Sequence, residues 1–401
     1  MSTAGRPPAL RGLPLLEDLP SLPGRRVLVR VDFNVPLRRL PSGRFEVADD
    51  FRIRAALPTL TWLLERGAAV TACSHLGRPH GAPDPRWSME PVRQRLSALC
   101  PGVALADNLR FDPGEESNDP AFVARLVDGF DAYVNEAFAA SHRAHGSVVG
   151  PPARLPSAAG RQVAREVEVL GSLLHDPARP FVAVVGGAKV ADKMGLLLSL
   201  ARRVDVLAVG GAMAFTFLAA QGHRVGSSIV DEERIADCRR LLAAGTTVLL
   251  PTDVVARDVR GDRNGAAGGH AGEEEVVVTG PDLAEGWAGF DIGPDTAEAF
   301  AAAVARAGTV LWNGPLGAFE DERFASGTRR VAEAVAASGG FTVVGGGDSA
   351  SALDRLGLAD RVGFLSTGGG ATLDFIEHGD LPGLAALRQA VNAPGHAGAR
   401  S

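Results

Sequence analysis

Residues 181–193 read FVAVVGGAKVADK: five apolar residues, two glycines, and then a segment with helical periodicity. A short apolar run that ends in Gly-Gly and leads into a helix is typical of the first strand, turn and helix of a parallel α/β sheet. The segment also contains Lys189 and Lys193, the two lysines among 41 basic residues. This stretch therefore predicts the start of an α/β domain whose first loop carries both lysines.

The same alternation of short apolar runs and helix-length patterns continues on both sides of this stretch. Helical patterns occupy 54–65 and 328–337, among others. The expected strands are 27–31, 69–72, 103–106 and 132–134 in the first half, and 181–185, 206–209, 247–250, 310–312, 341–344 and 362–365 in the second. This order predicts an α/β protein with two doubly wound parallel-sheet (Rossmann-like) lobes.

A chain of 401 residues exceeds what one hydrophobic core usually organises, which also favours two lobes. Pro and Gly interrupt the pattern at 150–160, GPPARLPSAAG, before a helical run at 161–174. The predicted parts are an N-terminal lobe over 1–155, a linking hinge helix over 156–175, a C-terminal lobe over 176–375, and a tail over 376–401 that packs back toward the first lobe. The Gly-rich stretch 257–275 predicts an exposed loop without a role.

Composition excludes several classes of protein. The net charge of −6 argues against a general nucleic-acid binder. Cys73, Cys100 and Cys238 form no CxxC pair, so neither a zinc site nor a disulfide framework is indicated and a reducing compartment is favoured. The chain has no signal-peptide pattern and no run of about 18 apolar residues. We therefore expect a cytoplasmic protein that does not bind a membrane.

Side chains that could bind a small anion follow the strands of the first half. Because ligands of α/β sheets bind beyond the carboxyl ends of the strands, these positions are the ones to inspect. They are Asp32 and Asn34 (VDFN), His75 and Arg78 (SHLGRP), Asn108 and Arg110 (NLRF), His142, Arg143 and His145 (SHRAH), and Arg52 at the start of a helix. Each arginine alone is typical of a solvated charge, but together they predict a site for one highly charged anion.

Glycines occupy the same positions in the second half, at 186–187, 210–211, 345–347 and 368–370. Glycine lets backbone N–H groups approach phosphate closely, so these loops predict a polyphosphate ligand and hence a nucleotide. A single Gly pair is usually a plain tight turn, and none of the loops matches the P-loop pattern.

Four further residues of the second half could act on such a ligand. The spacing of Lys189 and Lys193 predicts two ammonium groups on one helix face, where a phosphoryl group could lie between them. Asp348, in GGGDS, could hold Mg²⁺ on the nucleotide, or it could merely cap a helix. Glu320 could accept bonds from ribose hydroxyls, or it could be a solvated surface charge.

Taken in order, the motifs VRVDFNVP, SHLGRP, NLRF, SHRAH, GGAKVADK, GGAMAFTF, GWAGFDIGP, WNGPLGAFE, GGGDSA and STGGGA resemble one family, phosphoglycerate kinase. The match runs over nearly the whole chain. The resemblance implies a two-lobed, monomeric glycolytic enzyme that transfers a phosphoryl group between 1,3-bisphosphoglycerate and Mg-ADP, giving 3-phosphoglycerate and ATP.

The resemblance also implies a role for individual residues. The phosphoglycerate site of the N-terminal lobe would comprise Asp32, Asn34, Arg52, His75, Arg78, Arg110 and Arg143. The nucleotide site of the C-terminal lobe would comprise Lys189, Lys193, Gly211, Gly289, Asn313, Glu320, Gly346, Gly347, Asp348 and Ser349, with Asp348 on Mg²⁺. Arg52 and Lys189 would be catalytic, stabilising the phosphoryl group during transfer.

The chain also departs from the family pattern. The stretch 96–108 is shorter, as though one strand-helix unit were missing, and Phe364 stands where histidine is common. That histidine is thought to pair with the glutamate matched here by Glu166. Two alternatives therefore stay open: a divergent paralogue that phosphorylates another small carboxylate, and a non-catalytic nucleotide-binding protein on the same fold.

Overall fold

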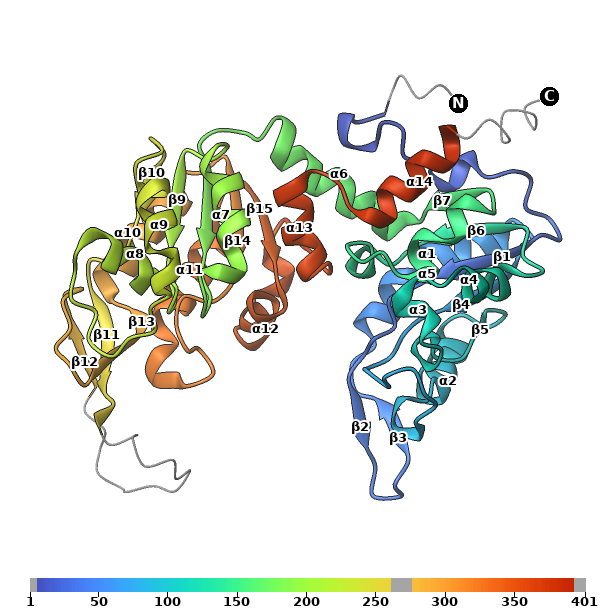
Figure 1. Ribbon diagram of the computed structural model, residues 1–401, viewed down its shortest axis with the longest axis horizontal. Coiled ribbons are helices and arrows are strands. Elements are labelled where there is room, and N and C mark those ends of the chain that lie inside the picture. Colours follow the sequence, from blue (N-terminus) through green and yellow to red (C-terminus); the bar gives the residue numbers. More distant parts are fainter. Residues whose placement is uncertain (1–5, 261–275, 393–401) are drawn as a thin grey trace. The chain divides into compact units, whose positions relative to one another are not determined.

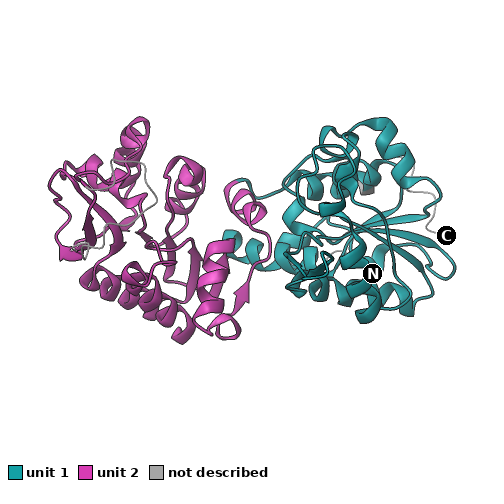
Figure 2. Ribbon diagram, turned by 90° about the horizontal axis from the view of Figure 1, so that it is seen from below, with its two compact units in different colours: residues 1–175, 378–401 teal, residues 176–377 magenta. Residues whose placement is uncertain are grey.

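The structure is a computed structural model that describes residues 6–260 and 276–392. The chain forms two compact units (Figure 2): unit 1 contains Met1–His175 and His378–Ser401, and unit 2 contains Asp176–Glu377. Most of the expected loop at 257–275, and residues 393–401 of the expected tail, lie outside the described residues.

A five-stranded parallel sheet forms the centre of unit 1 (Figure 1). Its strands are β1 (Arg26–Arg30), β4 (Ala69–Cys73), β5 (Ala104–Leu105), β6 (Ala132–Asn135) and β7 (Ser157–Ala159), in the spatial order β5-β4-β1-β6-β7. The order therefore reverses between β1 and β6, which marks the sheet as doubly wound. The strand β7 was not predicted, because its sequence, Ser-Ala-Ala, has little of the apolar character that marks a strand.

Helices cover the sheet of unit 1 with apolar faces. They are α1 (Phe51–Glu65), α2 (Glu90–Leu99), α3 (Gly114–Ser117), α4 (Pro120–Val127), α5 (Gly146–Val149), α6 (Arg161–His175) and α14 (Pro382–Asn392). In α1, Ile53, Ala56, Leu60 and Leu63 are buried at the spacing of one helix face. Near the start of α14, the Gly383 N–H donates to the Ser141 carbonyl at 2.9 Å, so this C-terminal helix packs on unit 1.

Unit 2 contains a six-stranded parallel sheet that is also doubly wound. Its strands are β8 (Phe181–Val185), β9 (Val206–Val209), β10 (Thr247–Leu249), β14 (Thr309–Asn313), β15 (Phe341–Gly345) and β16 (Phe364–Leu365), in the order β10-β9-β8-β14-β15-β16. All five residues of β8 are buried, as expected of a parallel strand covered on both faces. The predicted fold class is confirmed. The order reverses between β8 and β14, where a doubly wound sheet binds its ligands.

The helices of unit 2 follow its strands along the chain. They are α7 (Met194–Ala201), α8 (Ala214–Gln221), α9 (Ile235–Leu242), α10 (Pro294–Ala305), α11 (Ser326–Ala337), α12 (Gly347–Arg355) and α13 (Gly370–His378). No helix among the described residues is both long enough and apolar enough to cross a membrane.

Two antiparallel elements were not predicted. In unit 1, β2 (Leu37–Arg39) and β3 (Phe45–Val47) form a hairpin. In unit 2, β11 (Val254–Asp258), β12 (Val276–Thr279) and β13 (Trp287–Ile292) form a three-stranded sheet with a small apolar core of its own. The sequence of β13, WAGFDI, contains a glycine and an aspartate, two residue types that are uncommon in strands and that obscured the strand pattern.

Candidate functional site

A chain of hydrogen bonds in unit 1 joins residues from three of the loops that follow strands. The Arg52 guanidinium, in the first turn of α1, lies 2.5 Å from the Asp32 carboxylate. The Asn34 side chain accepts a bond from the Gly77 N–H at 2.9 Å, and Arg110 Nη1 donates to the Gly77 carbonyl at 2.8 Å. The loops after β1, β4 and β5 are therefore fixed to one another, with Asp32, Asn34, Arg52 and Arg110 brought together.

Arg110 is a buried cation with an unused donor. Its Nε forms an ion pair with a Glu116 carboxylate oxygen 2.9 Å away, but this buried N–H has no hydrogen-bond partner among the described residues. Burial lowers the pKa of the guanidinium, and the charges of Arg143 and Arg30 lower it further, while the carboxylates of Glu116 and Glu115 oppose the shift. A buried donor amid like charges is a feature expected of an anion site.

His75 is buried at the carboxyl end of β4 and is neutral. Burial lowers its pKa far below the usual range, and the charges of Arg30, Arg110 and Arg143 act in the same direction. The three arginine charges therefore lie close enough to His75 to disfavour its protonated form. The structure thus gathers His75, Arg110 and Arg143 near each other, as the sequence predicted.

Arg143 and Arg78 are exposed, and the charge of Arg143 acts on both His75 and Arg110. Arg143 Nε lies 3.1 Å from His142 Nε2, whereas Arg78 makes no hydrogen bond or ion pair with any residue in 6–260 or 276–392. Arg143, exposed and close enough to act on the buried Arg110 and His75, is therefore available to an incoming anion.

A buried network behind His75 was missed by the sequence analysis. Arg30, at the end of β1, donates to Ser147, and Ser147 in turn donates to the Glu115 carboxylate. All three residues are buried. The available signal was Arg30, which follows the apolar residues VLV in the run RVLVR, a position where a charge persists only if it is paired.

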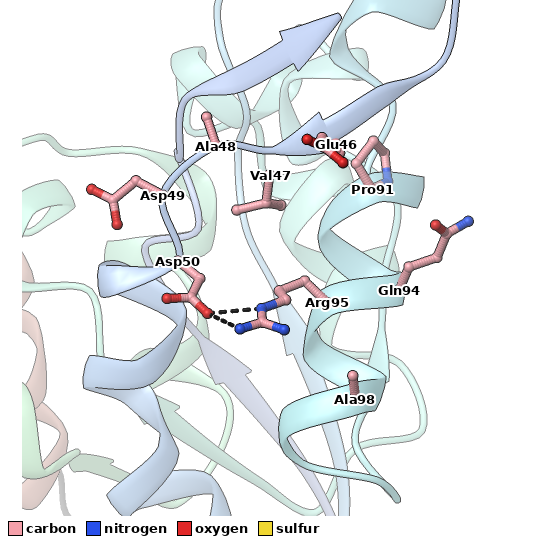
Figure 3. Close-up of a pocket in the computed structure, with 9 residues that line it drawn as sticks. All are labelled: Glu46, Val47, Ala48, Asp49, Asp50, Pro91, Gln94, Arg95 and Ala98. Atoms are coloured by element: carbon pink, nitrogen blue, oxygen red, sulfur yellow. Dashed lines mark hydrogen bonds and ion pairs between the residues drawn. The ribbon is translucent and has the colours of Figure 1, made fainter. Parts of the chain in front are cut away.

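Unit 1 also has a cavity of about 620 Å³ between β3 and α2 (Figure 3). Its walls carry Glu46, Asp49 and Asp50, and its basic residue, Arg95, donates to Asp50 from Nε at 2.7 Å. Since the lining is acidic and its cation is already paired, the cavity is unsuited to a phosphorylated acid. The Asp50–Arg95 pair instead joins α2 to the residue that precedes α1, the helix that carries Arg52.

Lys193 lies at the switch point of the sheet in unit 2. Its ammonium donates to the Gly186 carbonyl after β8 at 2.5 Å, to the Asn313 side-chain oxygen at the end of β14 at 2.7 Å, and to the Asn313 carbonyl at 3.3 Å. Burial lowers the pKa of Lys193 to about 8, and the negative charges of Asp348 and Asp192 partly oppose this. Lys193, Asn313 and Asp348 are therefore neighbours in the structure.

The glycines after β8, β9 and β14 pack against one another. A Cβ on Gly186 would lie 2.0 Å from the Pro315 carbonyl oxygen, and one on Gly211 would lie 2.7 Å from the backbone of Gly187. Gly211 and Gly314 also have positive φ angles of 68° and 90°. Glycine is required here because the loops themselves leave no room for a side chain.

The loop after β15 leads into the N-terminus of α12. Gly346 has a φ of 97°, which favours glycine, and Ser349 is buried and accepts a bond from the Gly314 N–H at 2.6 Å. Gly347 and Asp348 are exposed in the first turn of this nine-residue helix. The positive end of the helix and an exposed carboxylate thus lie beside the Lys193 site.

Lys189 does not share a helix face with Lys193, so that prediction is wrong. Lys189 lies in an exposed irregular segment, while Lys193 ends a short 3-10 turn, Ala191–Lys193, that precedes α7. The physical reason is that the Lys193 ammonium donates to three oxygen atoms of Gly186 and Asn313 at the ends of β8 and β14, which orients its side chain toward the sheet. Within residues 6–260 and 276–392, the Lys189 ammonium makes no hydrogen bond or ion pair.

Two other predicted nucleotide residues lie elsewhere in unit 2. Gly289 belongs to β13 of the antiparallel sheet, where a Cβ would lie 2.0 Å from the Phe215 ring. Glu320 is exposed in the turn segment after β14. Neither residue has a hydrogen bond that joins it to the Lys193 cluster among the described residues.

A buried carboxyl group lies at the start of α6. Burial raises the pKa of Glu136 to about 8 against hydrogen bonds from Thr59 and from the N-terminal N–H groups of α6. A Cβ on Gly160 would lie 1.8 Å from Glu136 Oε2. Glu136 thus satisfies the unpaired N–H groups of the helix that ends at the border between the two units.

The residues of 6–260 and 276–392 contain no group of three or more His, Cys, Asp or Glu side chains that could hold a metal ion. A metal at Asp348 would therefore need ligands from a bound molecule. This fits Mg²⁺, which typically takes one or two carboxylates together with phosphate oxygens.

Comparison with known proteins gives a consistent result. The family model described as phosphoglycerate kinase matches residues 16–106 and 101–379. The chain is 48% identical over 390 residues to the phosphoglycerate kinase of Rubrobacter xylanophilus, with 91% of this chain and 96% of the relative covered. It is 49% identical over 404 residues to that of Salinispora tropica, with 93% and 98% covered.

Solved structures agree with these relatives. The structure of phosphoglycerate kinase from Coxiella burnetii has a TM-score of 0.83 and 36% identity, over 93% of this chain and 98% of that one. The enzyme from Pyrococcus horikoshii has a TM-score of 0.79 and 28% identity, over 95% and 100%. The two segments of the family match meet at 101–106, inside the shortened stretch 96–108. The chain belongs to the phosphoglycerate kinase family.

Proposed function

We propose that this protein catalyses reversible phosphoryl transfer between 1,3-bisphosphoglycerate and ADP, giving 3-phosphoglycerate and ATP. The observation that carries the proposal is the cationic cluster of unit 1. The charges of Arg30, Arg110 and Arg143 all lower the pKa of His75, and those of Arg30 and Arg143 also lower the pKa of Arg110. One buried Arg110 N–H has no hydrogen-bond partner among the described residues, although its nitrogen lies 2.9 Å from a Glu116 carboxylate oxygen. A small polyanion would relieve this repulsion and take up the unused donor.

We propose that unit 1 binds the phosphoglycerate. The carboxylate and phosphate of this substrate are anions that arginine side chains hold through paired N–H donors. The residues assigned to this binding are Asp32, Asn34, Arg52, His75, Arg78, Arg110 and Arg143. The bonds from Arg52 to Asp32 and from the Gly77 N–H to Asn34 support the assignment, because they hold these segments in place before the substrate arrives.

We propose that unit 2 binds the nucleotide at the switch point between β8 and β14. The residues assigned to it are Lys189, Lys193, Gly211, Gly289, Asn313, Glu320, Gly346, Gly347, Asp348 and Ser349. Support comes from the N-terminus of α12, whose N–H groups and positive helix end favour phosphate, and from Lys193 beside it. Asp348 would hold Mg²⁺, which supplies positive charge to the phosphate oxygens of the nucleotide.

The proposed reaction needs no general base. The carboxylate of 3-phosphoglycerate, which attacks in one direction of the reaction and leaves in the other, has a reference pKa of about 4 and is already ionised at neutral pH. Catalysis then consists of alignment and neutralisation of the negative charge on the transferring group. We assign this neutralisation to Arg52 on unit 1 and Lys189 on unit 2. We call the phosphoglycerate site of unit 1 and the nucleotide site of unit 2 the two half-sites. Because they belong to different units, transfer requires the units to close, which also excludes water.

We further propose that the enzyme works as a monomer in the cytoplasm. One chain carries both half-sites, so a second copy is not needed to complete the site. Cys73, Cys100 and Cys238 are all free and buried, which fits a reducing compartment.

A coupled assay with ATP, Mg²⁺ and 3-phosphoglycerate tests the proposal directly. We expect turnover that depends on all three components. Other small carboxylates should be assayed in parallel, because the shortened stretch 96–108 is part of the lobe that binds the acid. Preferential turnover of another acid would identify a divergent paralogue. A folded protein that binds ATP without turnover of any acid would instead be a non-catalytic nucleotide-binding protein.

A further inference from the structure

Arg30 is a charged residue at the end of the central strand of unit 1, with only 1% of its surface exposed. Its Nε donates to Ser147 Oγ at 2.8 Å, and Nη1 donates to the Val31 carbonyl at 2.5 Å. Its Nη2 lies 3.1 Å from Nδ1 of His75. All three nitrogens of the guanidinium are therefore used inside unit 1, and one of them contacts a residue assigned to substrate binding.

The contact between Arg30 and His75 determines which ring nitrogen of the histidine carries its proton. A guanidinium has five N–H donors and no acceptor. Nδ1 of His75 can therefore take part in this hydrogen bond only as an acceptor, without a proton. Since the ring is neutral, its proton lies on Nε2. His75 then offers an N–H donor from Nε2, which suits an anionic ligand.

Ser147 and Glu115 hold Arg30 in this position. The Ser147 hydroxyl accepts from Arg30 Nε and donates to Glu115 Oε1 at 2.7 Å, and the Ser147 N–H donates to Glu115 Oε2 at 2.8 Å. The Glu115 carboxylate is fully buried and lies 4.0 Å from Arg30 Nη2. His145 Nδ1 lies 3.8 Å from the same carboxylate. Ser147 has a single hydroxyl proton, so its bond to Glu115 leaves its lone pairs directed to Arg30.

We propose that Arg30, Ser147 and Glu115 are positioning residues that fix His75 as the Nε2-protonated tautomer and thereby prepare it to donate to the phosphoglycerate. This inference rests on the proposed function, because it assigns a task to a residue of the proposed substrate site. None of the three residues needs to touch the substrate. Their effect should therefore fall on the binding of the acid and spare that of ATP.

The experiment combines nitrogen-15 NMR of histidine-labelled full-length protein with steady-state kinetics. In the unsubstituted protein, the His75 ring, assigned from the loss of its signals in His75→Gln, should show a protonated Nε2 and an unprotonated Nδ1. Ser147→Ala removes the hydroxyl that links Arg30 to Glu115 but keeps both charges. We expect a larger share of the Nδ1-protonated tautomer and a KM for 3-phosphoglycerate raised about tenfold, with the KM for ATP unchanged.

Ser117→Ala is the matched control. Ser117 lies in the same short helix as Glu115, but it is exposed and its hydroxyl donates to the Pro113 carbonyl at 3.1 Å. The same substitution there should change neither the tautomer nor either KM. If Ser147→Ala does not fold, Arg30→Met combined with Glu115→Gln removes both buried charges together, so that neither is left unpaired. This double variant should show the same two changes.

The inference is overturned if His75 is protonated on Nδ1 in the unsubstituted protein. It is also overturned if a folded variant of the network leaves the tautomer and the KM for 3-phosphoglycerate unchanged. An equal increase in both KM values would indicate general loosening of the fold and would likewise contradict it. An inactive protein whose His75 carries its proton on Nε2, with a shift in Ser147→Ala, would contradict the proposed function while supporting the positioning network.

Discussion

At the carboxyl ends of the strands in unit 1, the groups available to a ligand are side-chain charges: Arg52, Arg110 and Arg143, with His75 buried among them. At the same ends in unit 2, the loops are glycines packed against glycines, with the buried ammonium of Lys193 between them. The two sheets have the same doubly wound order around their switch points. The same scaffold therefore presents two different sets of groups at the places where we propose that the anions bind.

The difference shows what each half-site requires of the chain. Charged side chains hold a compact anion from several sides, but they must be kept in place by further bonds, such as those of Asp32, Asn34 and Ser147. Glycine loops bring the backbone close to an extended polyphosphate, but they tolerate no side chain. Substitutions in unit 1 should therefore change substrate affinity, whereas those in the loops of unit 2 should change stability.

Lys189 breaks this rule, because it is an exposed side-chain charge in a glycine loop of unit 2. Lys189→Ala should lower kcat by about 10²–10³-fold, the usual effect of removing a group that neutralises developing charge. Thermal unfolding should be unchanged, since the side chain makes no bonds among the described residues. Lys189→Arg should restore only part of the rate, because a guanidinium fork differs from a compact ammonium. Full activity of Lys189→Arg would show that lysine has no special role there.

Gly186→Ala tests the packing of the loops in unit 2. The new Cβ would lie 2.0 Å from the Pro315 carbonyl oxygen, so the backbone must shift. We expect a decrease of about 1–3 kcal/mol in the free energy of unfolding, measured by denaturant titration. Gly339→Ala is the control, since no atom lies within 4 Å of its Cβ. Equal stabilities of the two variants would contradict the role assigned to the glycines.

Lys193 gives unit 2 a characteristic dependence on pH. Its pKa is about 8 in the folded protein and 10.5 in an unfolded chain, so between these values the unfolded chain binds more protons. Stability therefore rises with pH through this window and is reduced below about pH 8. Lys193→Met should remove this rise, a difference of roughly 1–2 kcal/mol between pH 8 and pH 10. Hydrogen exchange of amides in β8 and β14 would measure it, and parallel pH profiles would disprove it.

Arg110→Lys tests whether unit 1 depends on the forked donor geometry of arginine. Lysine keeps the charge but loses the Nη1–H that donates to the Gly77 carbonyl and the Nε–H that forms no hydrogen bond among the described residues. The KM for 3-phosphoglycerate should rise about tenfold with little change for ATP. Arg125→Lys, at an exposed pair with Asp112, is the matched control and should behave as the unsubstituted protein. An unchanged KM in Arg110→Lys would mean that charge alone suffices.

The smallest effect is expected at the β2–β3 hairpin, where Arg38 forms an exposed ion pair with Glu46. Arg38→Ala should change the free energy of unfolding by less than about 0.5 kcal/mol, because exposed pairs are screened by water and salt. Substrate KM values should stay constant. A large change in the free energy of unfolding would contradict the expectation that an exposed ion pair of unit 1 adds little to stability.

Most strands of the two sheets could be predicted because a parallel strand buried on both faces must be apolar along its length. The expected strands at 181–185 and 206–209 coincide with β8 and β9. β7 and the antiparallel strands were not predicted, because alanine, glycine and half-exposed positions interrupt the apolar run that marks a buried strand. The pairing of Lys193 with Asn313 could not be predicted either, since 120 residues separate the two partners. The spacing of Lys189 and Lys193 predicted that they share one helix face, but the hydrogen bonds of Lys193 to residues distant in the sequence place it elsewhere.

The sequence by itself determined the order of strands and turns, the residue types at the strand ends and the family, because these follow from local periodicity and from motifs that are read along the chain. Only the tertiary structure decided which of those residues are buried, which are exposed, and what holds them. Arg30, Ser147 and Glu115 are far apart in the sequence and become one network only when β1, α3 and α5 pack together. The pKa of a side chain and the direction of its hydrogen bonds depend on such neighbours, which chain order does not specify.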